Sequence, residues 1–568
     1  MSRFLGFFVA AVACGWVGFQ PASVQAQGLA GAYLAANQAS RDNNYEQAAK
    51  FYAEALSRDP NNPFLLQNAL FAFVAKGDVD RAVAIATKVN SSEFGNRLAD
   101  LVLISDAVER GDYDRAAEVL EDGKDRFNVL IAPLLQGWIE LGLGQMSAAA
   151  KRFDSMTSPR GVQLFGQYHK ALALASVGDF VTADRILTGD EQGNLRLDRG
   201  SLIAHAQIMS QLDRADGAID MLDVTLAGTS DKGLQALRDQ IAEEGAVDFD
   251  YIRDARDGVA EVFLNLAGFP ADNGGDRDAL VYARLAQFLR PTSTQAILLT
   301  AEILQDQDQF DLATRTYALV GADDPMFLNA ELGRADALVD ADKRDAAIEV
   351  LRGLTRTHGD VPRVHMSLGD ALRGQERYDE ASEAYDVAVN MIPTPAPNHW
   401  FLFYARGITH EREDRWELAE ADFRRALELN PDQPLVLNYL GYSLVEKGMK
   451  LEEAQKMIET AVEKQPNSGF ITDSLGWVLY RVGKFEEAVA PMEKAVSLES
   501  DDPIINDHLG DVYWMVGRKR EARFQWSRAL SFEPEDKDAV RIRRKLEVGL
   551  DAVLKEEKAL EAAQGDGN

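Results

Sequence analysis

Small residues return along most of the chain at a nearly constant interval. Apolar residues three and four positions apart surround them, which is the spacing of amphipathic helices. Because a unit of about 34 residues can bury its apolar faces only by stacking on its neighbours, this period predicts an all-α repeat array. Alanine marks the interval at positions 48, 82, 116, 149, 183 and 218, and again at 279, 313, 347, 381, 419, 454, 488 and 522.

Glycine and proline follow the same period. Glycine stands twelve to thirteen residues before the later alanines, and proline stands twelve residues after several of them. In one unit, Gly476 and Ala488 are small enough to let two antiparallel helices approach closely. Pro466 lacks an N–H group and crowds the preceding turn, so it ends one unit before the next begins. Each unit is therefore predicted to be a pair of helices.

One late unit carries the complete set of marker residues: Leu509, Gly510, Tyr513, Ala522, Trp526, Ala529 and Pro534. Their spacing resembles that of the tetratricopeptide repeat family. The resemblance extends from about Leu29 to Glu535 and is weaker in the first half. It implies a right-handed superhelix, an α-solenoid, of about fourteen helix-turn-helix repeats with a non-catalytic role in binding proteins.

Departures from the period suggest the domain organisation. The gap between Ala218 and Ala279 is 61 residues, which leaves room for a non-repeat segment with a helix at Lys232–Glu244. A charged C-terminal helix is expected to shield the last apolar face from water. The predicted parts are a signal peptide at 1–26, about six degenerate repeats at 29–230, a helical insertion at 231–257, about eight repeats at 260–534, a capping helix at 535–563 and a disordered tail at 564–568.

The N-terminal residues resemble a secretory signal. Arg3 precedes an uncharged run from Phe4 to Phe19, which is shorter than the roughly 20 residues of a spanning helix. Small residues at the −3 and −1 positions of Val24-Gln25-Ala26 indicate cleavage after Ala26. This interpretation predicts a mature chain without a transmembrane segment, located in the periplasm.

A second interpretation of the same residues is a lipoprotein signal. Ala11-Val12-Ala13-Cys14 would then be the lipidation sequence, and acylated Cys14 would tether the protein to the outer membrane. An uncleaved signal anchor is a third interpretation. All three place the body of the protein outside the cytoplasm.

Composition limits the possible functions. The 91 acidic and 60 basic residues give a net charge of −31, which disfavours binding to nucleic acid. Cys14 is the sole cysteine, and no two of the seven histidines have zinc-protease spacing. Asp306, Asp308 and Asp311 lack the central glycine and final glutamate of a calcium loop. We therefore predict no cofactor, no metal and no enzymatic activity.

The resemblance implies that the first helix of each unit lines a concave groove. Aromatic and arginine side chains supply much of the energy at protein interfaces. The same aromatic residues could instead pack against the adjoining repeat, and the sequence leaves both interpretations open. The predicted partner-binding residues are Tyr404, Arg412, Asn438, Tyr442, Asp473, Trp477, Tyr480, Arg481, Asp511 and Trp514, and the second positions of the same helices hold Phe401, Leu435, Phe470 and Ile504.

A narrower resemblance suggests a partner. The runs Ala279–Pro291, Leu437–Val496 and His508–Leu530 are similar to proteobacterial envelope repeat proteins that act as adaptors for a carboxyl-terminal processing protease. That resemblance implies a scaffold for the protease and its substrates, often cell-wall cross-link hydrolases. The alternative is a structural or assembly factor for cell-wall, polysaccharide or outer-membrane biogenesis.

Overall fold

The computed structural model describes residues 29–92, 95–189, 199–227, 231–268 and 275–565. Within these ranges the chain forms 31 α-helices, two short 3-10 helices and no strand. The prediction of an all-α fold of helix pairs is therefore confirmed. The predicted signal peptide and residues 566–568 of the predicted tail lie outside the described residues.

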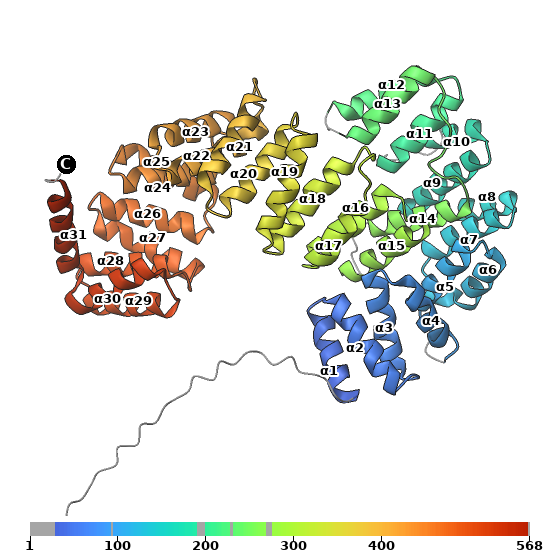
Figure 1. Cartoon of the computed structure of the whole chain (residues 1–568), viewed down its shortest axis with the longest axis horizontal. Coiled ribbons are helices and arrows are strands. Elements are labelled where there is room, and N and C mark those ends of the chain that lie inside the picture. The colour runs from blue at the N-terminus through green and yellow to red at the C-terminus, as the bar shows by residue number, and fades with distance from the viewer. Residues whose placement is uncertain (1–28, 93–94, 190–198, 228–230, 269–274, 566–568) are drawn as a thin grey trace, which may run out of the picture. The chain divides into compact units, whose positions relative to one another are not determined.

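The chain divides into two compact units, and the first ends at Lys343. Unit 1 contains helices α1 to α18 and the 3-10 helix η1 (Figure 1). Their bounds are α1 Leu29–Arg41, α2 Tyr45–Arg58, α3 Pro63–Lys76, α4 Val79–Asn90, α5 Arg97–Glu109, α6 Tyr113–Asp122, η1 Lys124–Arg126, α7 Ile131–Gly142, α8 Met146–Asp154, α9 Arg160–Ser176, α10 Phe180–Thr188, α11 Arg199–Gln211, α12 Ala215–Leu226, α13 Lys232–Glu244, α14 Ala255–Ala267, α15 Gly275–Leu289, α16 Thr294–Asp306, α17 Phe310–Tyr317 and α18 Phe327–Asp340.

Unit 2 begins at Arg344 and contains helices α19 to α31 and the 3-10 helix η2. The boundary lies within the range 260–534, which the sequence assigned to one block of repeats. Its helices are α19 Arg344–Thr357, α20 Pro362–Arg373, α21 Tyr378–Asn390, η2 Pro397–His399, α22 Trp400–Arg412, α23 Trp416–Leu429, α24 Pro434–Glu446, α25 Leu451–Lys464, α26 Gly469–Arg481, α27 Phe485–Leu498, α28 Pro503–Met515, α29 Lys519–Ser531, α30 Asp536–Val548 and α31 Leu550–Gly565.

The small residues of the period lie where paired helices make their closest contacts. Ala488 is fully buried, and a Cβ atom added at Gly476 would lie 2.5 Å from the side chain of Met492. A Cβ atom at Gly510 would lie 2.4 Å from the ring of Trp526. Because such distances are too short for real contacts, only glycine lets these helices pack around the large side chain.

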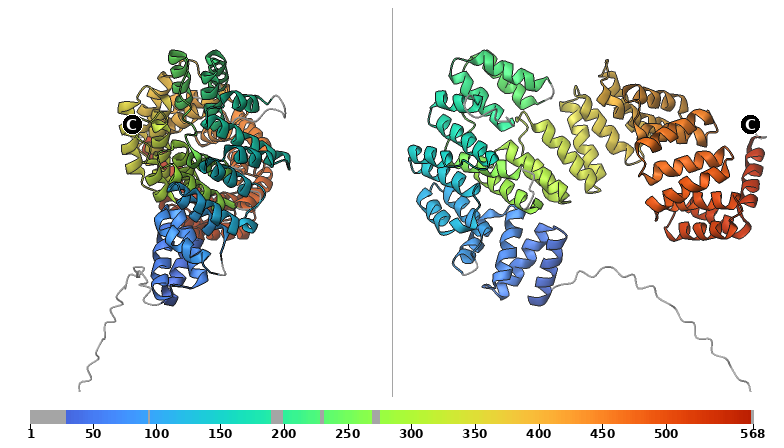
Figure 2. Two further views of the ribbon diagram at one scale, coloured as in Figure 1. Left: turned by 90° about the vertical axis from the view of Figure 1, so that its right-hand side faces the viewer. Right: turned by 180° about the vertical axis from the view of Figure 1, so that it is seen from behind.

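In unit 1, helices α14 and α15 turn back onto the earlier repeats. They pack against α3, α5 and α7, and α14 also contacts α9 (Figures 1 and 2). A Cβ atom at Gly258 of α14 would lie 2.1 Å from the ring of Trp138 in α7, so only glycine leaves room for this ring where the two helices meet. Farther along, Arg284 of α15 donates a hydrogen bond to the carbonyl of Ala75 at 3.1 Å. These contacts explain why the chain through α18 belongs to one unit.

Helix α14 is buried on all sides, and its polar groups are paired accordingly. Asp257 is fully buried and accepts a hydrogen bond from Nε of Arg253 at 2.7 Å. Glu261 is also fully buried and accepts hydrogen bonds from the hydroxyls of Tyr168 at 2.9 Å and Tyr251 at 3.0 Å. Since an unpaired buried carboxylate is costly, these partners are what allow α14 to occupy the centre of unit 1.

The C-terminal segment differs from the single capping helix expected at 535–563. The structure has two helices, α30 and α31, joined at Gly549. Gly549 has a φ of 87°, a left-handed conformation that favours glycine, and an added Cβ atom would lie 2.6 Å from the ring of Trp514. The sequence signal for this break was the glycine itself.

Candidate partner-binding site

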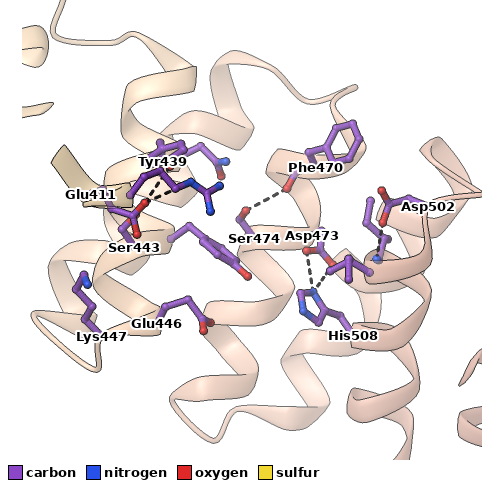
Figure 3. Close-up of a pocket in the computed structure, with 15 residues that line it drawn as sticks. Glu411, Tyr439, Ser443, Glu446, Lys447, Phe470, Asp473, Ser474, Asp502 and His508 are labelled. Atoms are coloured by element: carbon purple, nitrogen blue, oxygen red, sulfur yellow. Dashed lines mark hydrogen bonds and ion pairs between the residues drawn. The ribbon is translucent and has the colours of Figure 1, made fainter. Parts of the chain in front are cut away.

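In unit 2, the first helices of four consecutive pairs, α22, α24, α26 and α28, lie side by side and form what we call the first-helix face. This face is hollowed by a cavity of about 450 Å³, the central pocket (Figure 3). The pocket is lined by Glu411, Arg412, Asn438, Tyr439, Tyr442, Ser443, Glu446, Lys447, Phe470, Asp473, Ser474, Asp502, Ile504, Ile505 and His508.

Four of the ten predicted partner-binding residues line the pocket: Arg412, Asn438, Tyr442 and Asp473. They lie on three successive first helices, as the repeat position predicts. Asp473 receives a hydrogen bond from Nδ1 of His508 at 3.0 Å. The Oδ1 atom of Asn438 is buried and has no hydrogen-bond partner among the described residues.

Trp477 lies differently from the prediction, which placed its side chain facing the groove. Only 8% of its surface is exposed. Its ring stacks on the ring of His508 at 3.9 Å and on that of Tyr480 at 4.8 Å between centroids. Its Nε1 atom donates a hydrogen bond to Glu446 at 2.5 Å. The indole ring is therefore stacked on Tyr480 of its own helix and on His508 of the next repeat, as the alternative interpretation of packing against the adjoining repeat expects.

Trp514 and Asp511 are corrected in the same way. Trp514 is 8% exposed, packs on Trp526 at 5.3 Å between centroids, and donates a hydrogen bond to Asp551 at 3.0 Å. Asp511 is fully buried and accepts hydrogen bonds from Lys545 at 2.7 Å and from Trp526 at 2.9 Å. Both residues are covered by the C-terminal helices, whose position could not be inferred from the repeat pattern.

The other three predicted residues lie outside the pocket lining. Tyr404 is half-buried, and its ring lies 5.9 Å from that of Tyr439 between centroids. Tyr480 is half-buried beside Trp477. Arg481 is exposed and donates a hydrogen bond to Glu446 at 3.1 Å. These three residues contact side chains in or near the pocket but are not part of its wall.

The site prediction omitted several residues of the wall. Glu446 stands at the thirteenth position of its helix and accepts hydrogen bonds from Trp477 and Arg481. A charged residue at that groove position is the sequence feature that could have identified it. No feature of the sequence identified His508 as a residue of the pocket, because its role depends on Asp473 in the preceding repeat. Burial is the largest single influence and would lower the pKa of His508, but the carboxylates of Asp473, Asp507 and Asp511 together raise that pKa above its usual value.

An exposed apolar row runs along the same face. It consists of the second residue of each first helix, namely Phe401, Leu435 and Phe470, which are exposed, and Ile504, which is half-buried. Phe401 is 40% exposed, Leu435 is 47% exposed and Phe470 is 56% exposed. Phe470 and Ile504 also belong to the pocket lining. The row and the pocket therefore form one continuous surface, which we expect to bury apolar side chains of another molecule.

The chain was compared with protein-family models. Residues 332–398 and 400–433 each match a model described as the tetratricopeptide repeat. Residues 332–433 are thus similar to tetratricopeptide repeats. The matched residues include α19 to α23, so the family pattern is found in unit 2 beside the pocket.

Two curated proteins are similar to parts of this chain. The TPR repeat-containing protein PA4667 of Pseudomonas aeruginosa is 29% identical over 183 residues, which are 32% of this chain and 30% of that protein. Human tetratricopeptide repeat protein 13 is 26% identical over 178 residues, 30% of this chain and 20% of that protein. The chain thus spans less than a third of the length of these relatives.

Solved repeat structures are also similar. A chain of the APC/C hetero-tetramer Cut9–Hcn1 is 14% identical, with 91% of this chain and 96% of that chain covered and a TM-score of 0.38. YrrB, described as a TPR protein with an unusual peptide-binding site, is 19% identical, with 31% and 88% covered and a TM-score of 0.27.

Two further properties of the described residues bear on function. No group of three His, Cys, Asp or Glu side chains in the described part of the chain is arranged to hold a metal ion. None of the described helices combines the length and apolar character needed to cross a bilayer. The pocket offers apolar contact and hydrogen bonding, which are means of binding.

Proposed function

We propose that this protein is a non-catalytic scaffold that binds partner proteins through the first-helix face of unit 2. The observation that carries the proposal is the continuity of the exposed apolar row with the central pocket. A segment of a partner could bury Phe401, Leu435 and Phe470 and place polar groups in the pocket. Such an arrangement, apolar anchors beside a few polar groups, is common in sites that bind peptides.

The proposal assigns no comparable role to the first helices of unit 1. There α3, α5, α7 and α9 are in contact with α14 and α15. Contacts with α14 and α15 therefore cover part of their inner surface, although Phe64 at the second position of α3 is 48% exposed. We place the partner-binding surface in unit 2 for that reason.

We further propose that the protein acts in the cell envelope. The support is the signal-like sequence of residues 1–26, including Val24-Gln25-Ala26. The intact mass of the purified protein tests this proposal. A chain that begins at Gln27 supports periplasmic export after cleavage, a diacylglyceryl group on Cys14 supports an outer-membrane lipoprotein, and an uncleaved chain recovered from the cytoplasm contradicts both.

For the partner we propose a processing protease and the cell-wall hydrolases that it cleaves. The support is the resemblance of three runs, Ala279–Pro291, Leu437–Val496 and His508–Leu530, to envelope adaptors. One of these runs contains α26, and another begins at His508 within α28; both helices form walls of the pocket. A partner set composed of outer-membrane or polysaccharide assembly proteins would favour the alternative role.

Crosslinking in intact cells followed by mass spectrometry tests the binding function. Phe470→Asp places a charge in the apolar row, whereas Phe524→Asp does so on α29, outside the first-helix face, at a side chain that is 65% exposed. We expect Phe470→Asp to remove the crosslinked partners and Phe524→Asp to retain them. Equal retention by both variants would contradict the proposed surface.

A further inference from the structure

The acceptors of the central pocket point to the chemistry of the bound segment. We propose that the pocket receives a lysine or arginine side chain of the partner, flanked by apolar residues that lie on the exposed apolar row. This inference rests on the proposed function and specifies which segment the surface recognises.

The first argument is the repeated position of three acceptors. Asn438, Asp473 and Asp507 stand at the fifth position of α24, α26 and α28, at intervals of 35 and 34 residues. At two of these positions the next first helix supplies a nitrogen donor. Asp473 receives the ring nitrogen of His508 at 3.0 Å, and Asp507 receives the ammonium group of Lys545 at 2.7 Å.

Asn438 differs from the other two in lacking such a donor. Its buried Oδ1 atom has no hydrogen-bond partner among the described residues, and it lines the pocket. A buried acceptor without a donor is costly, and a donor from a bound molecule would remove that cost. At Asp507, Lys545 of this chain supplies the cationic donor. At Asn438 no donor is present among the described residues, so we infer that the partner supplies one.

The second argument is the charge around the pocket. Its lining includes the carboxylates of Glu411, Glu446, Asp473 and Asp502, against the cations of Arg412 and Lys447 and the imidazole of His508. These four carboxylates outnumber the two permanent cations of the lining, and Glu446 also pairs with Arg481, which lies outside the lining. A carboxylate-rich, partly enclosed site attracts a cation more strongly than the same groups would in open water.

The electrostatic environment of Tyr442, which lines the pocket, is also negative. Burial raises the pKa of the Tyr442 hydroxyl, and the carboxylates of Glu446 and Asp473 raise it further. Arg481 acts in the opposite direction but does not reverse the effect. A positive group beside Tyr442 would be stabilised by these carboxylates and by the face of the aromatic ring.

The third argument is the separation of apolar and charged groups along the face. Leu435, Phe470 and Ile504 lie at the beginnings of their helices, whereas Arg412 and Glu446 lie at the ends. Asn438 and Asp473, at the fifth position of their helices, lie between these two zones along the helix. A segment lying across the face would thus contact the row with apolar side chains and the middle of the pocket with its cation.

A random peptide library displayed on phage and panned against the full chain tests the inference. We expect the recovered peptides to carry a lysine or arginine next to apolar residues and to lose binding to the Phe470→Asp variant. Peptides that depend on Phe470 but show no excess of basic residues would overturn the cationic preference and leave the binding function standing. Recovery of no Phe470-dependent peptide would overturn both.

Asn438→Asp sharpens the test because it copies the residue found at the two equivalent positions. The added carboxylate should tighten binding of a lysine-containing library peptide by about fivefold, and Asn438→Leu should weaken it by about fivefold. Ser497→Asp is the matched control, since it adds the same charge at an exposed position on α27. Equal effects of Asn438→Asp and Ser497→Asp, with the fold intact by circular dichroism, would contradict the assignment of the cation to Asn438.

Discussion

The first helices of the two units have different neighbours. In unit 1, α3, α5, α7 and α9 each contact α14 or α15, and at one such contact Gly258 has no room for a Cβ atom beside Trp138. In unit 2 the equivalent face carries Phe401, Leu435 and Phe470 exposed to solvent. The repeated helix pair thus packs against other helices of its own unit in unit 1, whereas in unit 2 it presents an exposed apolar surface. The difference lies in what covers the face, which the repeat pattern alone does not encode.

The largest expected effect is in the closed core of unit 1. Trp138 is fully buried and donates a hydrogen bond to Nδ1 of His169 at 3.0 Å. Trp138→Ala should therefore cost ~3–5 kcal/mol of folding free energy. Because repeats contact mainly their neighbours, hydrogen exchange should rise throughout unit 1 and remain unchanged in unit 2. An equal rise in both units would show that they do not unfold separately.

The C-terminal end of unit 2 should be nearly as sensitive. Lys545 is fully buried between Asp507 and Asp511, and Lys545→Met would leave these buried carboxylates with only the more distant Arg541, at 3.8 and 3.6 Å, as a cation. The expected cost is ~3–5 kcal/mol in denaturant unfolding. Adding Asp507→Asn and Asp511→Asn to this variant should recover part of the loss, since neutral amides are cheaper to bury. A triple variant less stable than Lys545→Met would contradict this explanation.

Trp477 tests the correction made by the structure. Since its ring lies between His508 and Tyr480 and is 8% exposed, Trp477→Ala should cost about 3 kcal/mol in thermal or denaturant unfolding. An open groove position would have cost little. A variant as stable as the parent protein would restore the original interpretation of Trp477 as a contact for partners.

The sequence predicted the fold from residues that act locally. The spacing of Gly476 and Ala488 indicates a close helix pair, and the structure has Gly476 against Met492. Helix α13 spans Lys232–Glu244, the range expected from its amphipathic pattern. These features were predictable because each depends on residues that are close together in the sequence.

The predicted site was less complete because its contacts cross between repeats. Position within a helix placed Asn438, Tyr442 and Asp473 on the correct face. It could not show that Lys545 covers Asp511, or that Trp514 is covered near Gly549, because those contacts depend on where the C-terminal helices pack. Which face a residue lies on is local information, whereas its exposure is tertiary information.

The pH dependence of stability should differ between the two units. Burial lowers the pKa of His169 in unit 1 to about 3. Below a pH of roughly 6.5, its unfolded value, only the unfolded chain binds this proton, so unit 1 loses up to ~1.4 kcal/mol per pH unit as the pH falls toward 3. In unit 2 the pKa of His508 is raised, so its contribution is complete below pH ~6.5 and is lost as the pH rises through its folded value.

Substitution separates these two effects. His169→Gln keeps an acceptor for Trp138 and should reduce the loss of unit 1 stability between pH 7 and pH 5. His508→Gln should reduce the loss of unit 2 stability as the pH is raised above 7. Denaturant unfolding followed by hydrogen exchange at each pH measures both. Unchanged pH profiles in the two variants would mean that other groups dominate the titration.

The smallest expected effect on folding is at the proposed surface. Phe470 is 56% exposed, so Phe470→Ala should change the unfolding free energy by less than about 0.5 kcal/mol. If Phe470 is an interface anchor, the same substitution should weaken partner binding by about 2 kcal/mol, roughly thirtyfold. Calorimetric unfolding and titration with the captured partner measure the two quantities. A variant that loses stability but not affinity would make Phe470 a packing residue.

Site-specific photocrosslinking in intact cells tests the central comparison most directly. A photoreactive phenylalanine analogue would replace one residue at a time: Phe401 or Phe470 on the first-helix face of unit 2, Phe64 on α3 of unit 1, or Phe524 on α29. All four side chains are at least 40% exposed, so reactivity alone does not separate them. We predict that partner proteins crosslink to positions 401 and 470 and not to positions 64 and 524. Crosslinks at 64 or 524 with none at 401 and 470 would contradict the assignment of the binding surface to unit 2.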